Sequence, residues 1–224
     1  QELIKAALAE DLAGGVDITS QATIAADATA TADFIARTDG VIAGINIAHA
    51  VLAEVGLTDV TLAKKDGDRV KAGDLLITVH GNTRAILLAE RTALNFFGHL
   101  SGIATLTSKW VAEVSGTKCQ VRDTRKTTPG IRTIEKYAVR MGGGTNHRMN
   151  LSAGALIKDN HIAAAGGVIS AFAKVRAAYP EAEIEIEVDT LEQLKDVLTQ
   201  KPDLVLLDNM SPEQCAQAVA LVNG

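Results

Sequence analysis

The sequence predicts an α/β fold whose second half contains a parallel sheet. From residue 119 onward, short apolar stretches typical of strands alternate with longer helical patterns, and such alternation predicts parallel strands joined by helical crossovers. Polar residues follow each predicted strand, at the end where α/β barrels and open α/β sheets place their sites. The chain of 224 residues is 47% apolar and 22% charged, which is ordinary usage for a protein with a sizeable core.

The first half of the chain, up to about residue 100, is predicted to contain short strands followed by helices. Asp66-Gly67-Asp68 and Ala72-Gly73-Asp74 are turn signals. Apolar residues recur every three or four positions over 84–97, which predicts one helix, and a second helix is predicted over 104–114. The strand candidates of this half are 33–41, 59–61 and 75–79.

The second half repeats a strand followed by a helix four times. Ser211, Pro212 and Glu213 mark the start of the last helix, because Ser caps helices, Pro suits the first position and Glu favours the helix dipole. Four strands are too few to close a barrel, so we expect the C-terminal part of the fold to be missing from this sequence. The predicted strands are 119–122, 155–158, 184–188 and 204–207, and the predicted helices follow Gly130 and span 168–178, 191–198 and 212–222.

Basic residues are concentrated in the segment 118–161. It contains nine Lys and Arg against three Asp and Glu, although the whole chain has a net charge of -5. A basic segment in an acidic protein indicates a focused site for a small polyanion, and the acidic total argues against general nucleic-acid binding. The alternative is a solvated helix face, which we predict for Arg132, Lys136 and Arg140 because they recur at helical spacing.

Three residues that are candidates for a site also have structural interpretations. Arg91 follows Glu90 in an apolar helix, and spacing alone favours a surface ion pair over a binding role. Lys158 ends an apolar strand, where a lysine is seldom buried unless it is paired; a side chain that snorkels to solvent is the alternative. Asp208 follows an apolar strand and would serve equally well as a helix cap.

The histidines do not indicate a metal site. His49, His80 and His99 are scattered along the chain, and we predict structural roles for them. His147 and His161 lack the spacing of metal ligands, so no protein-bound zinc is predicted.

Glycine, cysteine and hydropathy patterns add three expectations. Three consecutive glycines at 142–144 predict a tight turn or a close approach of the backbone. Cys119 and Cys215 show no C-x-x-C spacing and are predicted to be reduced, buried thiols of a cytoplasmic protein. No apolar run approaches the roughly 18 residues that span a bilayer, and no signal peptide is visible, so no membrane partner is expected.

A series of motifs resembles, in the same order, those of the quinolinate phosphoribosyltransferases. Each motif alone is weak, but so many in the right order form a strong signal that covers nearly the whole chain. The motifs are EDL at 10–12, DIT at 17–19, ERTALN at 90–95, LSGIAT at 100–105, DTRKTTPG at 123–130, GGG at 142–144, NHRM at 146–149, ALIKDNH at 155–161, EVD at 187–189 and LDNM at 207–210.

The resemblance implies an N-terminal α/β sandwich over residues 1–100 and an irregular C-terminal α/β barrel over residues 101–224. It also implies a homodimer, in which the N-terminal domain of one subunit covers the active site in the barrel of its partner. In the family, two glycine-containing loops late in the barrel bind phosphate. Neither lies within this sequence, so we expect the barrel to be incomplete here and phosphate binding by those loops cannot be assigned.

The resemblance implies a decarboxylating phosphoribosyl transfer from 5-phosphoribosyl-1-diphosphate to quinolinate. The products are nicotinate mononucleotide, pyrophosphate and carbon dioxide, in de novo NAD biosynthesis. Both substrates are anions, and Arg suits carboxylates whereas Lys acts as a point charge on phosphates. The residues that the family pattern assigns to substrate binding are Arg91 from the other subunit, Thr124, Arg125, Lys126, His147, Arg148, Lys158, Glu187 and Asp208.

By the same resemblance, the catalytic residues are Lys158, Glu187 and Asp208. Glu187 and Asp208 would meet the ribose hydroxyls and stabilise the positive charge that develops on the ribose as diphosphate leaves. The cofactor implied is Mg²⁺, bound to the diphosphate with Glu187 and Asp208 as candidate protein ligands and no ligand assigned directly.

Two other interpretations remain open at the sequence level. The segment 66–74 is similar to part of a biotinyl or lipoyl carrier domain, but Lys64, Lys65 and Lys71 lack the Met-Lys-Met-type context of a modified lysine. A nicotinate phosphoribosyltransferase or a molybdenum-locus relative would share the fold and use a different acceptor.

Overall fold

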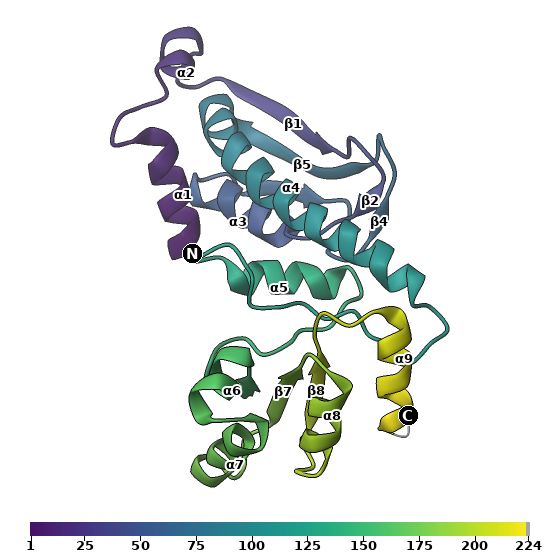
Figure 1. The fold of residues 1–224 in the computed structure, drawn as a ribbon. Helices are drawn as coiled ribbons and strands as arrows, with labels where there is room; N and C mark the ends of the chain where they lie inside the picture. Colours follow the sequence, from purple (N-terminus) through teal and green to yellow (C-terminus); the bar gives the residue numbers. More distant parts are fainter. Residues whose placement is uncertain (223–224) are drawn as a thin grey trace. The chain divides into compact units, whose positions relative to one another are not determined.

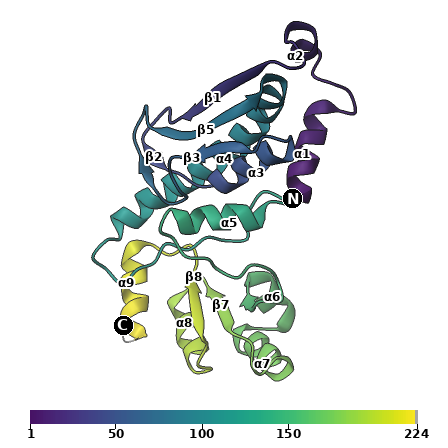
Figure 2. The same ribbon diagram turned by 180° about the vertical axis from the view of Figure 1, so that it is seen from behind.

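The computed structural model describes residues 1–222 and divides into two compact units, residues 1–147 and 148–224. Figures 1 and 2 show the elements of each unit from two sides. The mixed α/β class that the sequence predicts is confirmed. No helix within residues 1–222 is long and apolar enough to cross a membrane.

The first unit contains a three-stranded antiparallel sheet. Its strand order is β1 (Thr29–Ile35), β5 (Leu75–Asn82) and β3 (Asp59–Leu62), so that β5 is central. A separate antiparallel pair joins β2 (Gly40–Val41) to β4 (Arg69–Val70). The single strand predicted over 33–41 is therefore wrong, because the chain turns between Ile35 and Gly40 and its second part pairs with a different strand.

Helices α3 (Ile45–Glu54) and α4 (Thr83–Glu113) pack with this sheet, as both views of the ribbon show. The apolar cluster between them contains fully buried aliphatic side chains from the sheet and from both helices, among them Ile77 and Leu52. The remaining helices of the unit are α1 (Glu2–Leu12), α2 (Ile18–Thr23) and α5 (Arg132–Met141).

Helix α4 is continuous where the sequence predicts two helices with a break near residue 100. Gly98 and Gly102 lie inside it, and each glycine weakens a helix by about 1 kcal/mol relative to alanine. Leu100 and Ala104 are fully buried on the same stretch, so their packing offsets the weak propensity. The predicted domain division at residue 100 falls inside this helix and stays a prediction.

The second unit contains a parallel sheet, as predicted. The strand order is β6 (Ala155–Ile157), β7 (Ile184–Val188) and β8 (Leu204–Leu207). Ile184, Ile186 and Val188 are fully buried in the central strand. The connecting and flanking helices are α6 (Asp159–Ala165), α7 (Val168–Ala178), α8 (Leu191–Leu198) and α9 (Pro212–Leu221).

The strand predicted over 119–122 is wrong. Only an isolated parallel bridge joins Arg122 to Thr145. Residues 118–120 are exposed and Val121 is only half-buried, so this segment does not pack into the core of a sheet. Cys119, predicted to be buried, is exposed for the same reason, and Cys215 is half-buried; both are free thiols.

The three glycines at 142–144 mark a close approach of the backbone, as predicted. A Cβ atom on Gly142 would collide with the Ala104 carbonyl of α4, and one on Gly144 would lie 2.9 Å from the Thr107 Cγ2 atom. Gly143 has a φ of +88°, which a residue with a side chain adopts only at a cost. The turn after α5 therefore requires glycine to pack against α4.

Candidate active site

The first unit holds a loop of predicted ligand residues, 124–126, beside a second predicted ligand, His147. The amide of Thr145 donates to the Val121 carbonyl at 2.8 Å, and the amide of Asp123 donates to the Thr145 carbonyl at 3.2 Å. These bonds align the segment that leads into the loop with the segment that leads into His147. Residues 124–126 and His147, which belong to the same basic segment of the sequence, thus lie side by side in this unit, although more than 20 residues separate them.

A buried carboxylate, Asp123, joins these two segments. It accepts hydrogen bonds from the Lys136 ammonium, from the Asn146 side-chain amide and from the backbone N–H of His147 at 2.9 Å. The Lys136 ammonium also donates to the His147 carbonyl at 2.9 Å. The side chains of Lys136 and Asp123 are only 1% and 7% exposed, so water screens this pair very little.

The predicted solvated face of α5 is therefore wrong for Lys136, which is among the largest fully buried side chains of the protein. Its neighbours at helical spacing also have polar partners: Arg132 donates to the Thr127 hydroxyl at 3.0 Å, and Arg140 donates to the Asn146 side chain at 2.5 Å. Helical spacing shows that these cations share a face, but it does not show whether that face meets water or a polar network.

Glu135, also on α5, holds the far end of the loop. One carboxylate oxygen accepts the Thr128 backbone N–H at 3.0 Å, and the other lies 2.8 Å from the Nε2 atom of His99. Burial of the carboxylate raises its pKa, but the hydrogen bonds from Thr128 and His99 outweigh burial and hold the pKa of Glu135 below its ordinary value. Glu135 is therefore a fixed anion at neutral pH.

The loop between these anchors faces a cavity of about 330 Å³, which Thr124, Lys126 and His99 help to line. Thr124 and Lys126 are exposed, whereas Arg125 is half-buried. The Nε atom of Arg125 is buried and has no hydrogen-bond partner among the residues that the structure describes. Buried donors are nearly always paired in folded proteins, so this guanidinium is suited to an anionic ligand.

In the second unit, the predicted catalytic residues follow neighbouring parallel strands. Lys158 comes directly after β6, Glu187 lies near the end of β7, and Asp208 comes directly after β8. The Lys158 ammonium lies 2.8 Å from a Glu187 carboxylate oxygen. The structure therefore brings these three residues to one edge of the sheet, where α/β folds place their sites.

The charge of Lys158 is stabilised by its neighbours. The hydrogen bond to Glu187 raises its pKa above the ordinary value; burial opposes this, and the charges of Glu187, Asp208 and Asp159 reinforce it. The His161 Nδ1 atom accepts the backbone N–H of Lys158 at 2.9 Å. His161 thus caps the start of α6.

Arg148 binds within the second unit, where its guanidinium donates to the Gly154 carbonyl at 2.8 Å. It also lines a cavity of about 680 Å³ whose wall includes Leu151, Val175 and Tyr179. This cavity is largely apolar, and Lys158, Glu187 and Asp208 are not among its lining residues. It is poorly suited to two anionic substrates, although it is the larger space.

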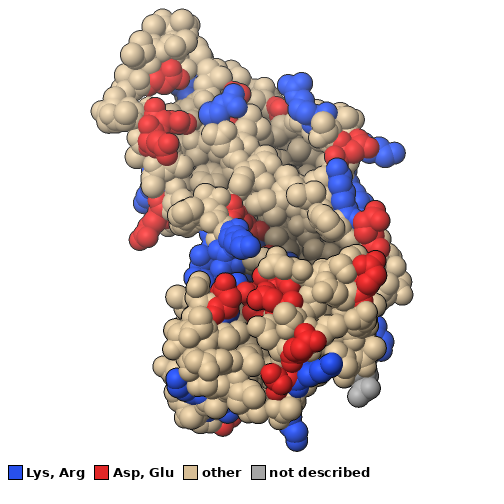
Figure 3. Space-filling view, viewed as in Figure 1, with Lys and Arg blue, Asp and Glu red and all other residues tan. Residues whose placement is uncertain are grey.

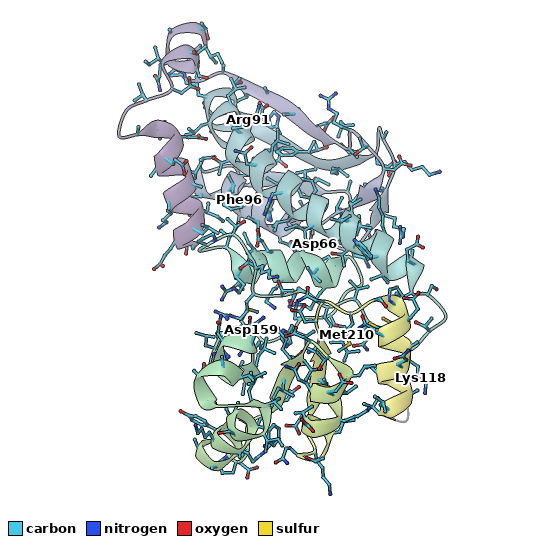
Figure 4. The ribbon with its side chains drawn as sticks, viewed as in Figure 1. Asp66, Arg91, Phe96, Lys118, Asp159 and Met210 are labelled. Carbon is cyan, nitrogen blue, oxygen red and sulfur yellow. The ribbon has the colours of Figure 1, made fainter. Side chains whose placement is uncertain are left out.

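Arg91 is exposed on α4, where Figure 4 marks its position. The next residue, Thr92, is buried and donates its hydroxyl to Asp11 of α1 at 3.0 Å. The helix is thus fixed at this point while the arginine side chain extends into solvent. Figure 3 shows Lys and Arg interspersed with Asp and Glu over the face that it displays.

Few side chains among residues 1–222 could bind a metal ion directly. Within residues 1–222, no group of three or more His, Cys, Asp or Glu side chains could hold a metal. Glu187 and Asp208 are oxygen ligands of the kind that Mg²⁺ prefers, and Mg²⁺ commonly takes only one or two protein carboxylates, with phosphates and waters completing its shell. The donor set therefore fits Mg²⁺ that is held mainly by a phosphorylated substrate.

Sequence reasoning missed the residues that hold the loop in place. Asp123 and Asn146 stand in family motifs that assign them no role, helical spacing predicts a solvated face for Lys136, and no pattern points to Glu135. No signal in the sequence separates these residues from a solvated helix face, because helical spacing does not show what that face packs against.

Comparisons with known proteins match the N-terminal and the C-terminal parts of the chain to the same family. The family model described as "Quinolinate phosphoribosyl transferase, N-terminal domain" matches residues 17–101, and the corresponding C-terminal domain matches residues 103–224. The carboxylating nicotinate-nucleotide pyrophosphorylase of Mycobacterium leprae is 51% identical over 222 residues, which cover 98% of this chain and 78% of that protein. The chloroplastic protein of the same name from Arabidopsis thaliana is 40% identical and is covered to 69% by a match over 99% of this chain.

Solved structures give the same result. The nicotinate-nucleotide pyrophosphorylase from Francisella tularensis superposes with a TM-score of 0.94 at 42% identity, covering 100% of this chain and 79% of that chain. The protein of that name from Ehrlichia chaffeensis superposes with a TM-score of 0.96 at 40% identity, covering 100% and 81% of the two chains.

Proposed function

This chain belongs to the quinolinate phosphoribosyltransferase family, and from that premise we propose that it transfers a phosphoribosyl group from 5-phosphoribosyl-1-diphosphate to quinolinate. The ring nitrogen of quinolinate forms a bond to the first ribose carbon, and the bond from that carbon to diphosphate breaks. The carboxyl group beside the nitrogen leaves as carbon dioxide, and the ring carbon takes up a proton. The products are nicotinate mononucleotide, pyrophosphate and carbon dioxide, as needed for NAD biosynthesis.

The observation that carries this proposal is the buried Nε atom of Arg125, which has no hydrogen-bond partner among residues 1–222. A planar guanidinium with a free donor suits a carboxylate, because it can form two parallel hydrogen bonds. Quinolinate has two adjacent carboxylates, and the family pattern assigns His147 and Arg148 to the same ligand. Their role is to neutralise the acid and to aim its ring nitrogen at the ribose.

Phosphate binding is assigned to the lysines. Lys126 is exposed on the loop and carries a compact charge suited to a phosphate oxygen, and Thr124 offers a hydroxyl two residues earlier. Lys158 would serve both substrates, since its neighbours keep it protonated at neutral pH. These cations offset the repulsion between two anionic substrates.

Glu187 and Asp208 are assigned to the ribose. As diphosphate departs, positive charge develops on the ribose ring, and fixed carboxylates stabilise that charge. The same two side chains would bind the ribose hydroxyls and hold the Mg²⁺ ion of the diphosphate. When bound, the ion offsets negative charge on the departing diphosphate.

We also propose a homodimer in which Arg91 enters the active site of the partner subunit. The exposure of Arg91 on α4 supports this role. We also propose a cytoplasmic location, which the free thiols of Cys119 and Cys215 support. Subunit mixing tests the dimer: Arg91→Ala and Lys158→Met proteins, each inactive alone, should regain part of the activity when refolded together. No recovery in proven mixed dimers would rule out a shared site.

The function itself is tested with the full-length protein and defined substrates. Quinolinate, 5-phosphoribosyl-1-diphosphate and Mg²⁺ should yield nicotinate mononucleotide and carbon dioxide in equal amounts, whereas nicotinate should give little product. Preference for nicotinate, or product without carbon dioxide, would contradict the proposal. An unmodified intact mass would also exclude a carrier domain.

A variant of Arg125 tests the assignment of the pocket. Arg125→Ala should reduce kcat/KM for quinolinate by about tenfold to a hundredfold, as expected when hydrogen bonds to a charged group are lost. Arg69→Ala, an exposed arginine on β4, is the matched control and should leave the constants unchanged. Near-normal use of quinolinate by Arg125→Ala would show that the role is wrong.

A further inference from the structure

Helix α5 carries polar side chains that the proposed chemistry does not use, although they contact both segments that bear ligand residues. We propose that Lys136 is a positioning residue for quinolinate, acting through Asp123 and the backbone of His147. The inference rests on the proposed function, since it concerns the same pocket. It assigns a role to a residue that touches no substrate.

The contacts around His147 carry the first step. Its backbone N–H donates to Asp123 at 2.9 Å, and its backbone carbonyl accepts from the Lys136 ammonium at 2.9 Å. The two peptide groups that flank this residue are thus held by one ion pair. Because the backbone of His147 is fixed, the direction of its imidazole side chain and the backbone direction at Arg148 are fixed as well.

The same ion pair also holds the loop that follows Asp123. The carboxylate that holds His147 belongs to the residue directly before Thr124, Arg125 and Lys126. Because one ammonium and one carboxylate contact both segments, the spacing between the loop and His147 depends on this pair. Asn146 reinforces the link by donating to the Lys136 carbonyl at 2.8 Å as well as to Asp123.

Helix α5 also holds the other end of the loop. Arg132 donates to the Thr127 hydroxyl at 3.0 Å, and Glu135 accepts the Thr128 backbone N–H at 3.0 Å. The loop is therefore anchored at both ends, with the exposed Thr124 and Lys126 side chains between the anchors. Ligand residues on a loop need such support, because small displacements weaken binding.

Stability alone does not explain a buried ion pair at this point. Removing two charges from water is unfavourable, and well-packed apolar residues of similar volume often serve a core as well or better. The additional bonds from the same pair to the His147 backbone give it a geometric role that apolar residues could not fill. This is the basis for assigning positioning rather than packing to Lys136.

The experiment compares Michaelis constants in the full-length protein. Lys136→Met keeps the length of the side chain and removes its charge and donors; Lys136→Met combined with Asp123→Asn also removes the stranded carboxylate. Both should raise KM for quinolinate by about tenfold or more, in line with the sensitivity of bound geometry to small displacements. Lys109→Met, an exposed lysine on α4, should leave KM unchanged.

The Michaelis constant separates positioning from loss of folded protein. Partial unfolding lowers the concentration of active enzyme and therefore the apparent kcat, but it leaves KM for quinolinate where it was. Asn146→Ala removes a half-buried member of the network and keeps the ion pair, so it should fold. It loses the bonds to Asp123 and to the Lys136 carbonyl, and it should raise KM about tenfold, as expected when a hydrogen bond to a charged group is lost. It supplies the measurement if neither charged variant folds.

Two failures are distinguishable. If wild-type protein forms no nicotinate mononucleotide from quinolinate, the proposed function fails. If wild-type protein is active but KM for quinolinate stays within about twofold of wild type in every folded variant, which is a difference far below one lost hydrogen bond to a charged group, the positioning role is overturned.

Discussion

Two lysine–carboxylate pairs, one in each unit, differ in their exposure to water. Lys136 and Asp123 have side chains 1% and 7% exposed, whereas Lys158 and Glu187 have side chains 44% and 7% exposed. In both pairs the carboxylate is buried. The difference lies in the lysine, which is enclosed in the first unit and open at the edge of a sheet in the second.

The comparison separates two uses of the same chemical pair. The enclosed ammonium uses its donors on Asp123 and on the His147 carbonyl, and its burial excludes a ligand. The open ammonium donates to Glu187 and retains donors that face solvent, so it can also bind a substrate anion. The exposure of the lysine, rather than the presence of an ion pair, distinguishes a residue that holds the backbone in place from one that can bind a ligand.

The largest expected effect concerns folding. Lys136→Met should lower the free energy of unfolding by about 3–5 kcal/mol, because it strands a buried carboxylate. Lys158→Met also removes the partner of a buried carboxylate, but Lys158 is open to solvent and water can replace it beside Glu187, so the loss should be smaller, about 1 kcal/mol. Urea denaturation followed by circular dichroism gives both values. Equal losses would show that the two pairs do not differ as described.

The next effect concerns catalysis by the open pair. Glu187→Gln should reduce kcat about a hundredfold or more, because a fixed charge that stabilises the transition state is lost. Glu181→Gln, at an exposed position in the loop before β7, is the matched control, because it lies at the opposite end of the strand from the residues that follow its carboxyl end. Its kcat should stay close to wild type. Similar losses in both variants would contradict a specific role for Glu187.

A smaller effect concerns the pH dependence of folding through Glu135. Its pKa is lower in the folded protein than its ordinary value of 4.5, so its stabilising contribution is present above that value and is lost as pH falls through the folded pKa. Wild type should exceed Glu135→Gln in unfolding free energy by about 1–2 kcal/mol at pH 7. The difference should vanish in acid; a constant difference in urea denaturation across that range would be inconsistent with this.

The smallest effect concerns the link between α5 and a turn of the first unit. The Tyr137 hydroxyl donates to Asp66 at 2.7 Å, and Figure 4 marks Asp66 beside the helix. Burial, followed by the Asp66 contact, raises the pKa of Tyr137 to about 12. Tyr137→Phe should cost about 1 kcal/mol of stability in thermal or urea unfolding. Tyr179→Phe, at an exposed position, should cost nothing measurable, and equal losses would refute the assignment.

The sequence predicted the second sheet well because its strands are short aliphatic runs between clear helical patterns. Ile184, Ile186 and Val188 are buried as such a pattern requires. The first unit was harder, since the sequence predicts two helices, 84–97 and 104–114, where packing against the rest of the unit supports one continuous helix. Local propensity is a weak guide where buried neighbours decide the outcome.

The candidate site shows a similar division. Family motifs named the residues for which the structure provides exposed or half-buried positions, such as Lys126 and Lys158. The bracing residues were not predicted, because a charge pattern on a helix does not reveal what the helix packs against. The burial of Lys136 depends on Asp123, 13 residues earlier, and on His147, 11 residues later.

Calorimetric titration of the full-length protein with quinolinate and with nicotinate tests the central claim, that this braced cationic pocket binds a pyridine dicarboxylate. Quinolinate should bind at least about tenfold more tightly than nicotinate, because a second carboxylate adds charged hydrogen bonds. Arg125→Ala should remove most of that difference. Equal affinities for the two acids, or an undiminished preference in Arg125→Ala, would contradict the account.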